Sequence, residues 1–349
     1  MSNRLKTPVQ LWLVAIVFAA LPVSTSHAQD KQDKIVELKL SDWVPTSHPL
    51  NKSLEEWGAS VEKASNGTIK YKMFPSQQLG KAFDHYDMAR DGIADLAFVA
   101  AGYQPGRFPV IEAGDLPFMI KDATGGAAAY NEWYQKYAPQ EMKDVKFCFA
   151  FAHDPGTFHS RDKKIVVPSD IKGMKIRPAQ AAIGSLMSQL GGTNVQAAAP
   201  EVRDVLEKGV ADAVTFPWNS VVLFGIDKVT KYHMDLPLYT TGLVWVMNKA
   251  VFESMSAAQK KVIDDHCNSE WAIRVTKPWA EFEHAGIAKI KEEPGHEVYT
   301  LTDDQLALWK SAAAPLLNSW HANVNKVGVD SDTAMKELKA TLIKYNAAF

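Results

Sequence analysis

Apolar and polar positions in the first third of the chain alternate between strand and helix spacing. The alternation of period two over 35–40 indicates a half-buried strand, and the apolar positions that follow it recur with helical spacing. The expected elements are a strand over 35–40, a helix over 49–64, a strand over 69–73, a helix over 81–91 and a buried strand over 96–99. Because a crossover helix joins parallel strands, this order predicts an α/β layered fold.

A second set of elements follows the same order with an unrelated sequence. It comprises a strand over 175–177, a helix over 181–190, a strand over 194–196, a helix over 201–208 and a strand over 212–215. Two α/β lobes are therefore expected. Lobe I is predicted to hold residues 29–154 with 242–281, and lobe II residues 155–241 with 282–349.

Helix-forming residues dominate the last third of the chain. A strand is expected over 243–247, and the segment 256–292 is interrupted only by Pro278. Helices much longer than 25 residues are unusual, so we expect one long helix, kinked at Pro278, that runs along both lobes. Two further helices are predicted over 302–328 and 333–345.

The N-terminus has the pattern of a secretory signal peptide. Arg4 and Lys6 precede an apolar run over 11–23, which is too short to span a bilayer, and Ser26 and Ala28 match a signal-peptidase site. We predict a signal peptide over 1–28, with export to the periplasm. An uncleaved membrane anchor is the alternative interpretation.

Charge and cysteine content limit the class of protein. The 38 Lys and Arg residues include two in the predicted signal peptide, which leaves 36 basic against 40 acidic residues in the mature chain. This slight negative charge does not indicate nucleic-acid binding. Cys148 and Cys267 either form a disulfide, which the periplasm permits, or remain two separately buried thiols.

Common catalytic and metal-binding motifs are missing from the sequence. It contains no Gly-x-Ser-x-Gly elbow, no P-loop, no Gly-x-Gly-x-x-Gly and no His-Glu-x-x-His. We therefore expect no metal and no cofactor, and a binding protein rather than an enzyme.

The segment 170–177, Asp-Ile-Lys-Gly-Met-Lys-Ile-Arg, resembles the signature Asp-Leu-Lys-Gly-Leu-Lys-Ile-Arg of TRAP transporter solute-binding proteins, the DctP family. The segments 74–80, 201–217, 246–248 and 255–259 are also similar to family segments and occur in the same order. This resemblance implies a two-lobed periplasmic-binding-protein fold with a central ligand cleft. It also implies a monomer that delivers a small organic carboxylate to integral membrane subunits.

The family's carboxylate-binding arginine corresponds to Arg177 in this chain. The planar guanidinium matches two carboxylate oxygens, and such charge-assisted hydrogen bonds are strong in a closed cleft. The alternative is that Arg177 pairs with a carboxylate of the protein, such as Asp154 or Glu201. The usual Arg-Val-Pro is here Arg177-Pro178, so the local backbone differs from the family pattern.

The other positions that correspond to ligand contacts of the family carry mostly aromatic side chains. The candidates are Trp43, His48, Tyr103, Phe158, His159, Phe216, Trp218, Asn219 and Tyr239. The second arginine of sialic-acid-binding members falls at Phe158, so we expect an aromatic or 2-oxo or 2-hydroxy monocarboxylate. For each aromatic residue, the alternative is that it packs in the hydrophobic core without contacting a ligand. His48 either contacts the ligand or caps the helix that follows.

Two other functions remain open from the sequence. In the first, the protein is an exported receptor that serves another importer or a sensor kinase. In the second, it is a periplasmic α/β enzyme. The aromatic segment 125–137 is interpreted as a surface helix that faces a membrane partner.

Overall fold

The computed structural model describes Met1, Ser2 and residues 34–349, and residues 34–349 form one compact unit. The predicted signal peptide and its cleavage site lie outside the described residues. None of the described helices is long and apolar enough to cross a membrane.

The first sheet has five strands in the order β2-β1-β3-β10-β4. The strands are β1 (Val36–Ser41), β2 (Ile69–Phe74), β3 (Leu96–Ala100), β4 (Val145–Ala152) and β10 (Gly242–Asn248). β1 pairs in parallel with β2 and β3, whereas β10 lies between β3 and β4 and is antiparallel to both. The four strands predicted in this sheet are confirmed, and β4 was not predicted.

The second sheet has six strands in the order β11-β9-β5-β8-β6-β7. They are β5 (Thr157–Ser160), β6 (Lys175–Arg177), β7 (Thr193–Asn194), β8 (Ala213–Phe216), β9 (Tyr232–Asp235) and β11 (Glu297–Thr300). β6 is parallel to β7 and β8, and β5 is antiparallel to β8 and β9. The sequence predicted β6 and β8; it placed β7 slightly late and missed the three remaining strands.

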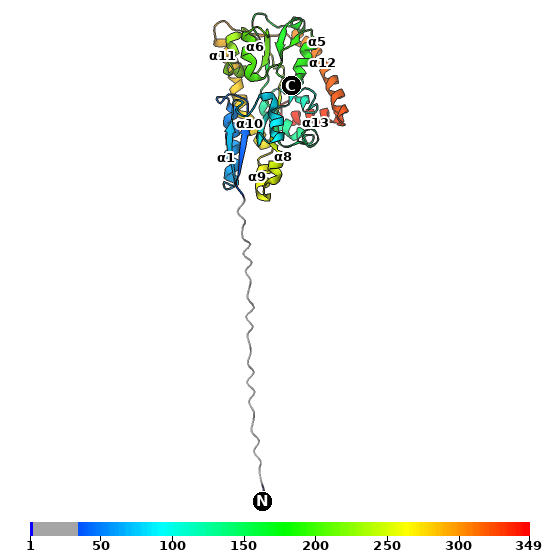
Figure 1. Ribbon diagram of the computed structural model, residues 1–349. Coiled ribbons are helices and arrows are strands. Elements are labelled where there is room, and N and C mark those ends of the chain that lie inside the picture. The colour runs from blue at the N-terminus through cyan, green and yellow to red at the C-terminus, as the bar shows by residue number, and fades with distance from the viewer. Residues whose placement is uncertain (3–33) are drawn as a thin grey trace. The chain divides into compact units, whose positions relative to one another are not determined.

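Helices cover both sheets. They are α1 (Pro49–Ala64), α2 (His85–Asp91), α3 (Ala123–Tyr134), α4 (Ala138–Glu141), α5 (Ala181–Gln189), α6 (Val202–Glu207), α7 (Trp218–Leu223), α8 (Lys249–Ser254), α9 (Ala257–Asp265), α10 (Ser269–His284), α11 (Gly286–Glu292), α12 (Asp303–Lys326) and α13 (Ser331–Lys344). Figure 1 shows α5, α6 and α11 at one end of the described unit, α1, α8 and α9 at the other, and α10 between them.

The predicted single helix over 256–292 is wrong in detail, because the segment forms α9, α10 and α11. The first break falls where Asn268 caps α10 by accepting a hydrogen bond from the Trp271 backbone N–H, and the second falls at Ala285. Pro278 lies inside α10 without ending it. A shorter helix still connects the two lobes, since α10 packs against α1 and α3 beside the first sheet and against α7 beside the second.

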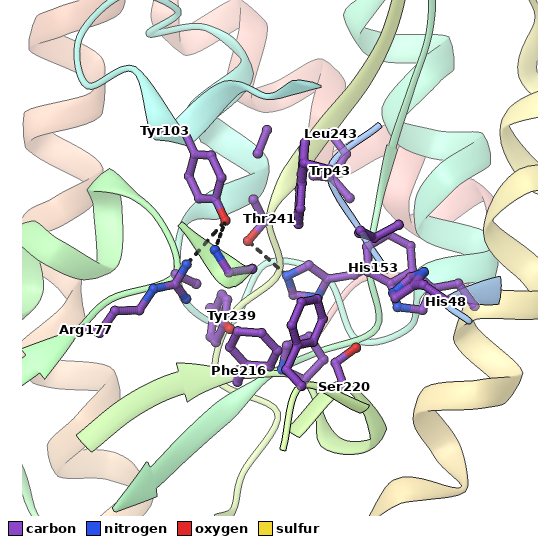
Figure 2. Close-up of a pocket in the computed structure, with 17 residues that line it drawn as sticks. Trp43, His48, Tyr103, His153, Arg177, Phe216, Ser220, Tyr239, Thr241 and Leu243 are labelled. Atoms are coloured by element: carbon purple, nitrogen blue, oxygen red, sulfur yellow. Dashed lines mark hydrogen bonds between the residues drawn. The ribbon is translucent and has the colours of Figure 1, made fainter. Parts of the chain in front are cut away.

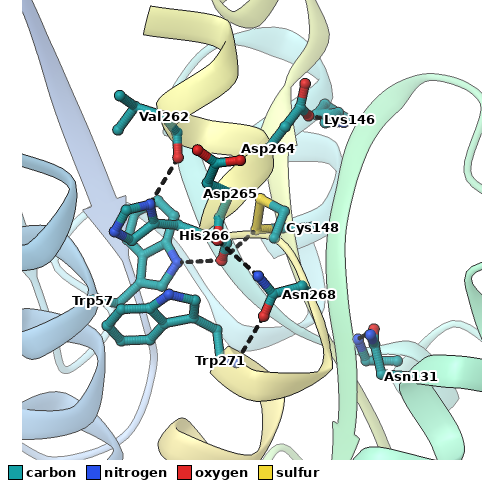
Figure 3. Close-up of a disulfide and its surroundings, with 12 residues drawn as sticks. Trp57, Asn131, Lys146, Cys148, Val262, Asp264, Asp265, His266, Asn268 and Trp271 are labelled. Carbon is teal, nitrogen blue, oxygen red and sulfur yellow. Dashed lines mark hydrogen bonds and ion pairs between the residues drawn. A yellow bond between two sulfur atoms is a disulfide. The ribbon is translucent and has the colours of Figure 1, made fainter. Parts of the chain in front are cut away.

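A disulfide joins Cys148 in β4 to Cys267, which lies between α9 and α10 (Figure 3). The neighbouring His266 carbonyl accepts a hydrogen bond of 2.9 Å from the Trp57 indole N–H of α1. The disulfide therefore fixes the start of α10 to the first sheet, and of the two alternatives for the cysteines the bonded pair is the one found.

The predicted surface helix over 125–137 is also wrong, because α3 is mostly buried. Trp133 and Tyr134 are fully buried, and the Asn131 side chain accepts a hydrogen bond from the Ala150 backbone N–H of β4. α3 packs between α10, α13 and β4, so its aromatic side chains belong to the core.

The predicted boundaries of the two lobes stay a prediction. Strands from 36–152 and 242–248 form the first sheet, and strands from 157–235 and 297–300 form the second. The C-terminal part lies beside the first sheet, where α13 packs on α3 and Ala348 pairs with Ile120.

The joint between α10 and α11 depends on a residue without a side chain. A Cβ atom at Gly286 would overlap the backbone nitrogen of Asn219 and the carbonyl carbon of Trp218 in α7. Ala normally stabilises a helix by about 1 kcal/mol relative to Gly. Backbone atoms cannot move aside cheaply, so we expect Gly286→Ala to destabilise the protein by about 2 kcal/mol, measured by urea denaturation. Ala288→Gly, at an exposed position of α11, is the matched control and should cost about 1 kcal/mol. An unchanged or higher stability of Gly286→Ala would show that the α11–α7 contact is not rigid.

Candidate functional site

A cavity of about 50 Å³ lies where the ends of strands from both sheets meet. The first sheet and its helices contribute residues that follow β1, β3 and β4, together with Trp279 of α10, and the second sheet contributes the ends of β6 and β8. The lining residues are Trp43, Val44, His48, Ala100, Tyr103, His153, Arg177, Ala179, Ala199, Phe216, Pro217, Ser220, Phe224, Tyr239, Thr241, Leu243 and Trp279. Carboxyl ends of strands are a usual position for ligand sites in α/β folds.

Arg177 ends β6 and is 1% exposed. Its Nε donates to the Ala197 carbonyl (2.9 Å), Nη1 to the Thr215 carbonyl (3.4 Å) and Nη2 to the Tyr103 hydroxyl (3.3 Å). A guanidinium has five N–H donors, so one on Nη1 and one on Nη2 form no hydrogen bond within residues 34–349 and can serve a carboxylate.

The guanidinium of Arg177 forms no salt bridge within residues 34–349. Asp154 pairs with His284 (2.8 Å) and Glu201 with Lys81 (3.8 Å), so neither of the two carboxylates considered as its partner is close to it. Burying an unpaired charge is costly, and buried charges are normally paired. The arrangement can therefore accept an anion from outside the chain.

Tyr103 connects the two lobes at the edge of the cavity. Its hydroxyl oxygen accepts hydrogen bonds from Arg177 Nη2 and from the Ala199 backbone N–H (3.0 Å), as Figure 2 shows. The residue lies just after β3 of the first sheet, whereas both donors belong to the second lobe. The hydroxyl hydrogen of Tyr103 is still available to a ligand beside Arg177.

Two histidines in the wall of the cavity are neutral. Burial lowers the pKa of His48 to about 3, with nearby His153 contributing, and burial lowers the pKa of His153 to about 4. His153 Nδ1 faces the Asp154 carbonyl (2.6 Å), which only accepts, so Nδ1 carries the proton. The unprotonated Nε2 then accepts from the Thr241 hydroxyl (2.9 Å; Figure 2). Among the described residues that line the cavity, Arg177 alone is charged at neutral pH.

Aromatic rings form most of the remaining wall. Trp43 stacks on Phe98 at 4.9 Å between ring centroids, and the Phe216 ring lies under the Arg177 guanidinium at 5.6 Å. Burial raises the pKa of Tyr239, which keeps its hydroxyl protonated. The Trp43 indole N–H and the Tyr239 hydroxyl are buried without a hydrogen-bond partner among the described residues.

Glu283 of α10 holds two of the residues that line the cavity, Ser220 and Trp279, in place. Its carboxylate accepts hydrogen bonds from the backbone N–H groups of Asn219 (2.7 Å) and Ser220 (3.0 Å), from the Ser220 hydroxyl and from the Trp279 indole N–H (2.7 Å). Burial raises the pKa of Glu283, and these donors oppose that rise. The carboxylate thereby positions two lining residues, Ser220 and Trp279, relative to each other.

Six of the ten residues predicted from the sequence line the cavity: Arg177, Trp43, His48, Tyr103, Phe216 and Tyr239. The other four lie elsewhere. Phe158 packs on Trp309 of α12 in the core, and His159 bonds to His233 (2.8 Å) and the Phe216 carbonyl (3.1 Å). β5 runs antiparallel to β8 and pairs Thr157 with Phe216, so the chain moves away from the cavity as it passes through Phe158 and His159.

Trp218 and Asn219 face away from the cavity because α7 begins directly after Pro217. The Trp218 and His159 rings lie nearly perpendicular to each other, with 5.2 Å between their centroids. The Asn219 amide donates to the Phe282 carbonyl (2.7 Å) and its oxygen accepts from Lys289 (3.1 Å). Both residues therefore join α7 to its neighbours, and the next residue, Ser220, is the one that lines the cavity.

His153, Ser220, Thr241 and Trp279 also line the cavity but were not predicted from the sequence. His153 directly follows β4, so recognition of the apolar run 145–152 as a strand would have placed it at a strand end, where α/β folds often bind ligands. Trp279 lies within a helix, and its helical spacing gave no sign of a ligand site. No group of His, Cys, Asp or Glu that could hold a metal ion occurs among the described residues.

Comparison with known proteins gives consistent matches over most of the chain. Residues 40–323 match the bacterial extracellular solute-binding proteins of family 7, DctP. A solute-binding protein from Albidiferax ferrireducens is 23% identical over 84% of this chain and 88% of its own length. Among solved structures, a marine metagenome TRAP solute-binding protein specific for aromatic acid ligands, in complex with metahydroxyphenylacetate, is 34% identical (TM-score 0.82, 89% of this chain, 99% of that chain).

A second solved structure, a TRAP periplasmic solute-binding protein from Bordetella bronchiseptica with bound (R)- and (S)-mandelate, is 27% identical (TM-score 0.83, 88% of this chain, 99% of that chain). The predicted two-lobed α/β fold is thereby confirmed, and the resemblance noted in the sequence extends to both lobes. Because the family match covers most of the chain, this protein belongs to the DctP family of TRAP transporter solute-binding proteins.

Proposed function

We propose that this protein is the periplasmic receptor of a TRAP transporter and that it binds a small monocarboxylate, aromatic or carrying a 2-oxo or 2-hydroxy group, with the carboxylate on Arg177. The observation that carries the proposal is the buried Arg177 guanidinium, which has two free N–H donors and no carboxylate partner within residues 34–349. A carboxylate of the ligand would compensate this charge through a bidentate pair.

The wall of the cavity supports the proposed body of the ligand. Trp43, Tyr103, Phe216, Tyr239 and Trp279 present aromatic surface, and no second charge faces the cavity from the described residues. The related proteins whose ligands are aromatic acids and mandelate agree with this class of ligand.

Binding is expected to hold the two lobes together. Arg177 belongs to the second lobe and Tyr103 and Trp43 to the first, so a ligand that contacts all three favours the closed arrangement over an open one. We further propose that residues 1–28 direct export and that the closed receptor delivers its ligand to integral membrane subunits without changing it chemically.

A thermal-shift screen of organic acids tests the proposed ligand class. Aromatic and small 2-oxo or 2-hydroxy monocarboxylates should raise the melting temperature of the mature protein more than neutral sugars or amines do. At a ligand concentration of 100 times Kd, binding adds about 2.7 kcal/mol to the free energy of unfolding. A screen in which sugars or amines gave the larger shifts would contradict the proposal. Recovery of each acid unaltered after incubation with the protein would separate binding from enzymatic turnover.

A further inference from the structure

We propose that the cavity recognises a second, uncharged oxygen of the ligand, remote from the carboxylate, through the N–H donors of His48 and Trp43. This inference rests on the proposed function and narrows the ligand to oxygenated monocarboxylates, such as acids with a hydroxyl group on an aromatic ring.

The proton of His48 is placed by its role as a helix cap. His48 precedes α1, and its Nδ1 accepts a hydrogen bond of 3.1 Å from the Leu50 backbone N–H. A neutral imidazole carries one proton, so an accepting Nδ1 leaves that proton on Nε2. His48 is 2% exposed and lines the cavity, and its Nε2–H has no hydrogen-bond partner within residues 34–349.

Trp43 supplies the second donor. The indole N–H can only donate, and in this chain it is buried without a partner among residues 34–349. The stacking of the Trp43 ring on Phe98 and its contact with Tyr103 hold the ring in place. Buried donors are almost always hydrogen-bonded in native proteins, and an unpaired one costs about 1–3 kcal/mol. Trp43 and His48 both line the cavity, so a single acceptor on a bound ligand can serve the donors of the short segment 43–48.

The charges around the cavity show which acceptor fits. His48 and His153 are neutral, and the carboxylate of Glu283 is already satisfied by four donors. A second carboxylate on the ligand would have no cation opposite it, and an amine would have no free anion. The acceptor is thus a hydroxyl, keto or ether oxygen.

The position of this oxygen follows from the arrangement of the lining residues. Figure 2 shows Arg177 and His48 at opposite ends of the cavity, with Tyr103, Thr241 and Trp43 between them. A ligand whose carboxylate lies on Arg177 therefore presents its far end to His48. A substituent on the aromatic ring reaches that end, whereas the oxygen of a 2-hydroxy or 2-oxo group stays beside the carboxylate.

Isothermal titration calorimetry with matched acids tests the inference. The mature wild-type protein is titrated with phenylacetate and its three ring-hydroxylated isomers, and with benzoate and 3-hydroxybenzoate. At least one hydroxylated acid should bind about tenfold more tightly than its parent, because one well-placed hydrogen bond to an otherwise unpaired donor contributes on that order.

Two variants assign the effect to the two donors. His48→Asn keeps a side-chain acceptor that caps α1 but removes the Nε2–H, and Trp43→Phe keeps an aromatic ring but removes the indole N–H. The measured quantity is the ratio of the two affinities in each variant, and each variant should reduce the preference for the hydroxylated acid to threefold or less, whatever its affinity for the parent acid. Melting temperatures of the ligand-free variants establish that they are folded.

The outcomes separate this inference from the proposed function. If parent and hydroxylated acids bind wild type with equal affinity, or if the variants weaken both acids in parallel, the second-oxygen site is refuted while the carboxylate site stands. If no monocarboxylate binds wild type, the proposed function itself fails.

Discussion

Replacing Arg177 with Ala is expected to weaken binding of the carboxylate ligand by about a hundredfold or more. Arg177 is the one charge that the described lining residues present, and removing one partner of a buried, hydrogen-bonded charge pair typically costs 2–5 kcal/mol. The protein should remain folded, because Arg177 forms no salt bridge within residues 34–349 and donates only to two backbone carbonyls and one hydroxyl. Calorimetric titration and circular dichroism measure the two properties separately.

Two further variants make this result specific. Arg177→Lys keeps the charge but loses the planar fork and the shared contact with Tyr103, so its affinity should lie between those of wild type and Arg177→Ala. Arg274→Ala removes an exposed arginine that pairs with Glu270 on α10, and it should bind as wild type does. Retention of wild-type affinity by Arg177→Ala would place the carboxylate elsewhere.

Removing the disulfide should have the largest effect on stability. The bond between Cys148 and Cys267 closes a loop with a sequence separation of 119 residues. In the chain-entropy account, a cross-link over such a distance stabilises the folded state by about 4–5 kcal/mol, and measured losses for native disulfides are about 2–5 kcal/mol. The double variant Cys148→Ala/Cys267→Ala should lose a comparable amount of unfolding free energy in guanidinium denaturation.

A reducing agent provides the control for this prediction. Dithiothreitol should lower the denaturation midpoint of wild type towards that of the double variant and leave the double variant unchanged. Alanine is used because Cys148 is buried, and a serine hydroxyl there would add a polar group to the core. Equal midpoints of wild type and double variant would show that the contacts around the disulfide, such as Trp57 with His266, hold α10 without it.

Local sequence pattern predicted the parts of the fold in which each element buries one face. The β-α-β order over β1, α1 and β2 was readable because strand alternation, helical spacing and the turn Asn66-Gly67 agree. The split of 256–292 into three helices depends on tertiary structure. Cys267 is bonded to β4 and Gly286 lies against the backbone of α7, and neither constraint is visible in helical spacing.

Short strands on the outer part of the second sheet were missed for a similar reason. β9 and β11 have four residues each and carry mixed side chains, so their pairing rather than their pattern makes them strands. For the site, the family resemblance pointed to Arg177 and Phe216, and both lie at the ends of parallel strands, β6 and β8, in the wall of the cavity. The sequence alone did not show that Phe158 and His159 lie away from the cavity, because this depends on β5 running antiparallel to β8.

The position of β10 determines when this protein can complete its fold. β3 and β4 both end before residue 153, yet the strand that fits between them comes from residues 242–248. All residues of β3 and β10 are buried, so until β10 arrives the apolar edges of the first sheet have no partner. The chain must therefore be synthesised as far as Asn248 before the first sheet can be completed. A fragment ending before β10 would leave the edges of β3 and β4 unpaired and prone to aggregation.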